Sequence, residues 1–180
     1  MIPGELLHLL DGIGARLDLE GYENATTIRD NVALLVTDAE PGLPVKGLRI
    51  VARDNDAFTN ETFEILRDEF DSTQLQSERS EAVVKLPDSV ASSSRRISFV
   101  VFRNDRAFHS NEQFFVNSRV LSVNVENLTQ FDAGESVDIH FSSLTGDPAR
   151  NQSRACAFWH FLEDGQGYWS QQGCTFIRAT

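Results

Sequence analysis

The residues best suited to chemistry in this chain lie together near its C-terminus. The segment CAFWHFLEDGQGYWSQQGC, residues 156–174, contains both cysteines and both tryptophans of the 180-residue sequence. Two cysteines can form a disulfide or contribute to a metal site. Cys156, His160 and Cys174 would supply three zinc ligands with no fourth at a defined spacing, so we expect no metal. From the residues alone, the simplest interpretation is one Cys156–Cys174 bridge that closes a hairpin.

The residues between the two cysteines predict that hairpin. The sequence EDGQG, residues 163–167, is rich in turn-forming residues. Trp159, Phe161, Tyr168 and Trp169 would then meet across two short strands and stabilise the pair through aromatic contacts.

Other patterns that could support chemistry are rejected. A calcium loop would begin at Asp54 and Asp56, but Phe58, Thr59 and Ile65 occupy its fifth, sixth and twelfth positions. The sequence contains neither Gly-x-Ser-x-Gly nor a phosphate-binding glycine loop, and its four histidines have no metal-ligand spacing. We therefore expect no conventional enzyme, no cofactor and no metal.

Composition restricts the class of protein. Asp and Glu outnumber Lys and Arg by 27 to 16, a net charge of −11 that argues against a nucleic-acid partner. No stretch reaches the roughly 18 to 20 apolar residues of a membrane span. Pro3, Gly4 and Glu5 interrupt any signal sequence after Met1.

Four Asn-x-Ser/Thr sequences point instead to an exported chain. They begin at Asn24, Asn60, Asn127 and Asn151, and each is eligible for glycosylation in a secreted protein. Asn151 lies in a predicted turn and is the favoured acceptor. An exported chain without a leader would be an internal piece of a larger protein.

The periodicity of apolar residues predicts a mainly β fold. Residues 5–18 carry a helical apolar stripe that includes Leu6, Leu9, Leu10, Ile13 and Leu17, and residues 21–30 would add a short helical turn. The acidic run 54–71 is expected to be a solvated loop and helix face. Strands are predicted in residues 30–38, 47–54, 81–88, 97–102, 121–126 and 136–142. We predict an antiparallel β-sandwich preceded by one or two short helices.

The hairpin also resembles a known family. It is similar to the GPS proteolysis-site motif that ends the GAIN domain of adhesion G-protein-coupled receptors, and its GYWSQQGC segment is especially similar to the latrophilin-like branch. The matching positions are Cys156, Phe158, Trp159, Gly167, Trp169, Ser170, Gly173 and Cys174. The resemblance implies that residues 1–30 end a helical subdomain and that 31–180 form the GAIN β-sandwich, with a partial GPS hairpin at 156–180.

The resemblance also implies a function and partners. In the intact receptor this region would lie on the extracellular face of the plasma membrane and couple an extracellular ligand or force to G-protein signalling. Its partners would be a downstream GPS strand, the seven-helix domain of the same receptor and an unknown extracellular protein ligand.

The chain departs from the family pattern after Cys174. In the family, two further cysteines and a His-Leu-Ser/Thr sequence follow, and the first and second cysteines pair with the third and fourth. The resemblance therefore implies downstream partners for Cys156 and Cys174. Self-cleavage needs a hydroxyl nucleophile and a base, which this chain lacks, so it would be truncated before the cleavage site. We expect an open apolar slot and an unpaired edge in its sandwich.

Two alternatives remain open at this point. One is a secreted β-sandwich binding module or decoy, complete with its own Cys156–Cys174 bridge. The other is the GPS-bearing region of a polycystin-type membrane protein, which shares this hairpin.

Overall fold

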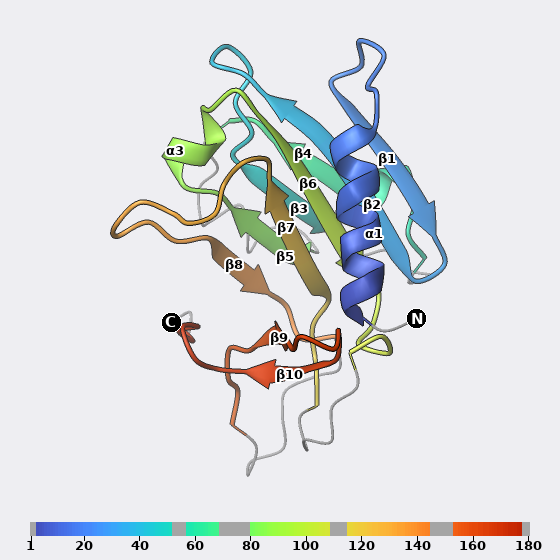
Figure 1. The fold of residues 1–180 in the computed structure, drawn as a ribbon, viewed down its shortest axis with the longest axis vertical. Coiled ribbons are helices and arrows are strands. Elements are labelled where there is room, and N and C mark those ends of the chain that lie inside the picture. The colour runs from blue at the N-terminus through green and yellow to red at the C-terminus, as the bar shows by residue number, and fades with distance from the viewer. Residues whose placement is uncertain (1–2, 52–56, 69–79, 109–114, 145–152, 178–180) are drawn as a thin grey trace.

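Two four-stranded antiparallel sheets stack face to face in the computed structural model, which describes residues 3–51, 57–68, 80–108, 115–144 and 153–177 (Figure 1). The first sheet has the strand order β1 (Asn24–Arg29), β2 (Val32–Ala39), β6 (Arg95–Phe102), β7 (Val120–Val125). The second has the order β4 (Phe63–Leu66), β3 (Gly47–Val51), β5 (Ser80–Lys85), β8 (Asp138–Phe141). The predicted antiparallel β-sandwich is confirmed.

The space between the two sheets is filled by alternate residues of their strands. Leu35, Phe99, Leu48 and Val84 come from four different strands, and each is at most 2% exposed. We call the whole buried set the inner core: Ala33, Leu35, Ala39, Val45, Leu48, Ile50, Ala82, Val84, Leu86, Val90, Ile97, Phe99, Val101 and Val125. Because side chains alternate along a strand, this core uses only one face of each sheet.

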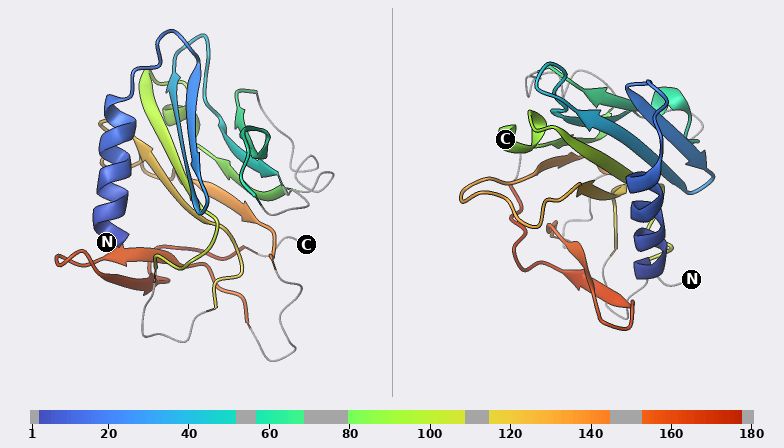
Figure 2. Two further views of the ribbon diagram at one scale, coloured as in Figure 1. Left: turned by 90° about the vertical axis from the view of Figure 1, so that its right-hand side faces the viewer. Right: turned by 45° about the horizontal axis from the view of Figure 1, so that its top comes forward.

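The other face of the first sheet is also covered. Helix α1 (Pro3–Arg16) lies along β2 and β6 on that face (Figure 2). The residues buried there form the outer core: Leu7, Leu19, Leu34, Val36, Val100, Phe102, Phe108, Val120 and Trp159. The two cores explain why β6 is apolar on both sides, as predicted for a central strand. The segment β2, predicted with one apolar face, is likewise buried on both.

The predicted first helix is confirmed, with a shifted apolar stripe. Leu7 is 8% exposed, whereas the predicted stripe members Leu9 and Ile13 are 53% and 44% exposed. Gly14 lets the helix approach β6 closely, since a Cβ at this position would lie 3.3 Å from the Cβ of Ser98. The glycine that lowers helix propensity therefore has a packing role. No helix in the described residues has the length and apolarity needed to cross a membrane.

Two local predictions were wrong. The helical turn expected in residues 21–30 is the edge strand β1. Within the acidic run expected to be loop and helix face, Asn60–Thr62 form the 3₁₀ turn η1 and Phe63–Leu66 form β4. Between β5 and β6 lies the short helix α3 (Asp88–Ala91).

The Arg95-Arg96 pair begins β6. The guanidinium of Arg96 donates hydrogen bonds to the carboxylate of Asp38 and to the carbonyl of Leu17, just after α1.

A buried ion pair joins the two sheets near one edge. Arg119 immediately precedes β7, and its guanidinium donates to both carboxylate oxygens of Glu81 on β5, at 2.6 and 2.8 Å. It also donates to the carbonyl of Arg103 at 2.6 Å and lies over the ring of Phe58. The side chains of Arg119 and Glu81 are only 4% and 14% exposed. This bidentate pair fixes β7 against the second sheet.

Candidate functional site

The aromatic segment near the C-terminus forms the predicted hairpin. Strands β9 (Phe158–Phe161) and β10 (Gly167–Ser170) pair antiparallel, with Trp159 opposite Trp169. The turn is closed by a hydrogen bond from the Leu162 amide to the carbonyl of Gln166, at 2.8 Å. Gly165 has a φ of 78°, which glycine adopts without strain. Tyr168 pairs with His160, and Phe161 lies opposite Gly167.

One face of the hairpin packs on the outer core. Trp159 is 9% exposed, and its ring lies 5.4 Å from that of Trp169 and 5.5 Å from that of Phe108. Both contacts are edge-to-face, the arrangement that aromatic quadrupoles favour. A Cβ at Gly167 would lie 2.5 Å from Nε1 of Trp159, so only glycine fits opposite this indole.

The hairpin also contacts the beginning of α1. It lies across one end of the sandwich, beside the N-terminal end of the helix (Figures 1 and 2). The amide of Gly4 donates to the carbonyl of Gly165 at 3.3 Å. The hairpin therefore meets two elements that are distant in sequence, α1 through its turn and the first sheet through Trp159.

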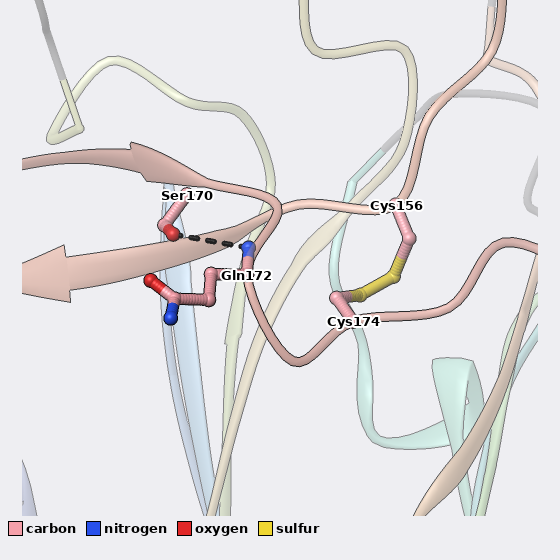
Figure 3. The surroundings of a disulfide bond; sticks show 4 residues. All are labelled: Cys156, Ser170, Gln172 and Cys174. Carbon is pink, nitrogen blue, oxygen red and sulfur yellow. Dashed lines mark hydrogen bonds between the residues drawn. A yellow bond between two sulfur atoms is a disulfide. The ribbon is translucent and has the colours of Figure 1, made fainter.

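The two cysteines are joined at the base of the hairpin. Cys156 precedes β9 and Cys174 follows β10, and their Cα atoms are 5.7 Å apart, an ordinary disulfide separation (Figure 3). Beside them, the amide of Gln172 donates to Oγ of Ser170 at 3.2 Å, and Gly173 adopts a positive φ of 85°. This is the bridge expected from the residues alone. The pairing with downstream cysteines implied by the resemblance stays a prediction.

The face of the hairpin opposite the tryptophans is open to solvent. Phe158 and Tyr168 are 41% and 38% exposed. The ring of His160 contacts the rings of both. Within the part of the chain that the structure describes, no group of three or more His, Cys, Asp or Glu side chains could hold a metal ion. Asp54 and Asp56, the start of the rejected calcium loop, lie outside the described residues.

A second unusual feature is the uncovered inner face of β8. Ile139 pairs with Val84 and Phe141 with Ala82, and directly opposed residues of antiparallel strands share a face. Val84 and Ala82 belong to the inner core, yet Ile139 and Phe141 are 41% and 46% exposed. Their side chains thus point to the side of the second sheet that forms the core, but they are only partly covered.

The facing edge of the first sheet is β7. Figure 1 shows β7 and β8 on the same side of the sandwich, and the amide of Leu144 after β8 donates to the carbonyl of Asn117 before β7, at 3.2 Å. Leu121 and Val123, on the inner face of β7, are only partly buried. We call Leu121, Val123, Ile139 and Phe141 the open edge. The expected open apolar slot and unpaired edge stay a prediction.

The candidate glycosylation sites are dispersed. Asn24 begins β1, Asn60 lies in η1 and Asn127 lies in the turn after β7, all three exposed. Asn151, the favoured acceptor, lies outside the described residues.

Sequence reasoning missed Phe108 as the residue whose ring contacts both tryptophans. Its segment FRNDRAF contains the turn-forming residues Asn104 and Asp105, and no local signal marks a side chain that is buried by distant elements.

Comparison with known proteins identifies this fold. Residues 44–180 match the family described as "GPS: GAIN subdomain B". Among solved structures, the full extracellular region of zebrafish Gpr126/Adgrg6 superposes with a TM-score of 0.69 and 23% sequence identity, over 97% of this chain and 23% of that one. At this identity the likeness shows the fold, and the chain spans only about a quarter of that region's length. No curated protein matches. Since the family match includes both most of the sandwich and the hairpin, the chain belongs to the GAIN subdomain B family, the domain of adhesion G-protein-coupled receptors that its hairpin residues resemble.

Proposed function

We propose that this chain is the extracellular GAIN/GPS region of an adhesion G-protein-coupled receptor, in which it couples an extracellular ligand or force to G-protein signalling. It does so by holding a downstream strand of the same receptor on the open edge of its sandwich. The domain acts through binding and release of that strand, without conventional catalysis. Its further partners are the seven-helix domain of the same receptor and an extracellular protein ligand.

The observation that carries this proposal is the exposure of Ile139 and Phe141. Their register partners are at most 1% exposed, whereas these two side chains remain 41% and 46% exposed on the same face. Full burial of a large apolar side chain contributes about 1.5–3 kcal/mol, so each of these partly covered side chains forgoes roughly 1 kcal/mol. A strand with apolar residues on one face would recover part of this free energy and would also pair with the edge of β8 that has no strand partner among the described residues.

The hairpin supports the same function through its position. Cys156 and Cys174 bracket the aromatic strands, and the motif residues Trp159 and Gly167 fix the hairpin on the outer core. Its turn contacts the beginning of α1 through Gly4 and Gly165. A pull on the helix would therefore act on the hairpin directly, by a contact separate from the open edge.

The test uses the receptor encoded by the natural transcript, with Ile139→Asp and Phe141→Asp introduced singly and together. A buried carboxylate in the slot opposes strand binding, because desolvating a charge is unfavourable. At equal amounts on the cell surface, we expect higher basal G-protein signalling than in the wild-type receptor, measured with a reporter for the second messenger.

The matched control is Ile13→Asp on α1, where the side chain is 44% exposed but does not belong to the open edge. It should leave basal signalling unchanged. Unchanged signalling in both open-edge variants, with normal surface amounts, would contradict the proposal.

A further inference from the structure

We infer that Asn127 carries an N-linked glycan and is the efficiently used acceptor among the three sequons in the described part of the chain. The inference rests on the proposed extracellular location, because N-linked glycans are added to chains that enter the secretory pathway. It goes beyond that function by assigning one modification to one residue of the fold.

The Asn127 sequon lies in a turn that exposes both of its defining residues. Asn127 follows the end of β7 in a tight turn, in which the amide of Leu128 donates to the carbonyl of Val125 at 3.1 Å. Its φ of 56° lies in the left-handed region, which asparagine tolerates better than most residues. Asn127 and Thr129 are both exposed, so the amide and the hydroxyl that define the sequon can be reached together.

The Asn60 sequon differs in its hydroxyl residue. Asn60 is exposed, but Thr62 is only 2% exposed. Oγ1 of Thr62 accepts a hydrogen bond from the amide of Thr59 at 2.9 Å, as part of the cap of η1. In this fold the hydroxyl that the transferase must recognise is buried and already bonded.

The Asn24 sequon is held in a sheet. Asn24 pairs with Thr37 and Thr26 with Leu35, so the sequon is extended along β1 and cannot form a turn without breaking the ladder. Thr26 is also partly buried, whereas Thr129 is exposed. Among the three sequons, only that of Asn127 combines a turn with an exposed asparagine and an exposed threonine.

The surroundings of Asn127 also have room for a glycan. The amide of Glu126 donates to the carbonyl of Arg96 at 2.8 Å, and Arg95 donates to the carbonyl of Glu126 at 3.0 Å. These bonds hold the base of the turn against β6. Figure 1 shows that this end of β7 points away from the hairpin β9–β10. A glycan here would extend into solvent from a fixed turn, without covering the aromatic hairpin.

The experiment expresses residues 1–180 in animal cells behind a cleavable secretion signal, so that the chain meets the glycosylation machinery whatever its natural location. The secreted protein is treated with an amidase that releases N-linked glycans in heavy-oxygen water, which converts each occupied asparagine to labelled aspartate. Peptide mapping should find the label at Asn127 in most molecules, and at Asn24 and Asn60 in a minority.

Two variants test the site without relying on one substitution. Asn127→Asp keeps a residue that tolerates the left-handed turn, and Thr129→Ala leaves Asn127 itself in place. Each should remove the mass of one glycan, whereas the matched control Asn60→Asp should remove that mass in only a minority of molecules. Secreted protein with unlabelled Asn127, or with unchanged mass in both variants, would overturn the inference. That result would leave the proposed receptor function standing, since signalling is tested separately at the open edge.

Discussion

The inner and outer cores are closed by different means. The inner core lies between two hydrogen-bonded sheets, and its large members Leu48, Val84 and Phe99 are at most 1% exposed. The outer core combines α1, the turn at Phe108 and the hairpin over one face of a single sheet, and its members Leu7 and Trp159 are 8% and 9% exposed. The residues that cover the outer core are thus less deeply buried than the strand residues of the inner core, so we expect the hairpin to detach before the sandwich unfolds.

The outer core also contains a polar defect. Nε1 of Trp159 is buried, with no hydrogen-bond partner among the described residues. A buried donor without a partner costs about 1–3 kcal/mol, which offsets part of the gain from burying the indole. The hairpin is therefore docked with less net free energy than its aromatic area indicates. Under the proposed function, in which a pull on α1 acts on the hairpin, such moderate docking would be an advantage.

The largest expected effect is in the inner core. Phe99→Ala removes a ring that is 1% exposed at the centre of β6, and such changes cost about 4 kcal/mol through lost burial and the cavity left behind. We expect the whole sandwich to unfold in one transition, at a lower urea concentration than the wild-type chain. Urea titration monitored by circular dichroism measures this shift. If Phe99→Ala destabilised the chain less than a truncation in the outer core, the contrast between the cores would be wrong.

The second effect concerns the ion pair that joins the sheets. Arg119→Met leaves the mostly buried carboxylate of Glu81 without its partner, which we expect to cost about 3 kcal/mol. Urea titration measures this loss. The double variant Arg119→Met with Glu81→Leu removes both charges and should regain part of it. A double variant no more stable than the single one would show that the loss comes from packing of Arg119 on Phe58 and not from the unpaired charge.

The third effect separates the two cores. Trp159→Ala removes the side chain that docks the hairpin, and the lost burial is partly offset by removal of the unpaired N–H, so we expect a loss of about 2 kcal/mol. Hydrogen exchange should become fast in β9 and β10, while β2 and β6 stay protected. Gly167→Ala, which places a Cβ against the same indole, should give the same local pattern. Loss of protection throughout β6 in both variants would contradict a detachable hairpin.

Local pattern predicted much of this molecule. The segments of β5, β6 and β7 were found because their apolar residues alternate or run continuously. The hairpin was found because cysteines, tryptophans and turn residues are concentrated between residues 156 and 174. These features depend on neighbours in the sequence, so the sequence reports them directly.

The remaining features depend on distant contacts. The strand β1, with the sequence NATTIR, is polar because an edge strand buries little, and β4 is too short to show a period. The alternation of Val137, Ile139 and Phe141 predicted a core face, but it could not reveal that this face is uncovered. Nor could local pattern pair Arg119 with Glu81, which lies 38 residues away in the chain.

The smallest expected effect lies at the helical side of the outer core. Burial raises the pKa of Asp11 on α1, although a hydrogen bond with Asn124 and the charge of His8 act in the opposite direction. The native state then binds the proton of Asp11 more tightly than the unfolded chain, whose pKa stays near 3.8. The free energy that this group adds to stability is fully present below the pKa of the unfolded chain. It is lost as the pH rises through the native pKa. Asp11→Asn should therefore stabilise the chain at neutral pH, by less than about 1 kcal/mol because the group is partly solvated.

The measurement is the difference in unfolding free energy between Asp11→Asn and the wild-type chain, from urea titrations at several pH values between 3 and 7. We expect the difference to grow in favour of the variant as the pH rises through the native pKa, and then to level off. The matched control Asp30→Asn changes an exposed carboxylate in the β1–β2 turn and should show no such growth. A constant difference for Asp11→Asn would mean that this carboxylate is equally solvated in both states. The helix would then contribute to the outer core through its apolar contacts, and the unpaired Nε1 of Trp159 would be the polar weakness of that core within the described residues.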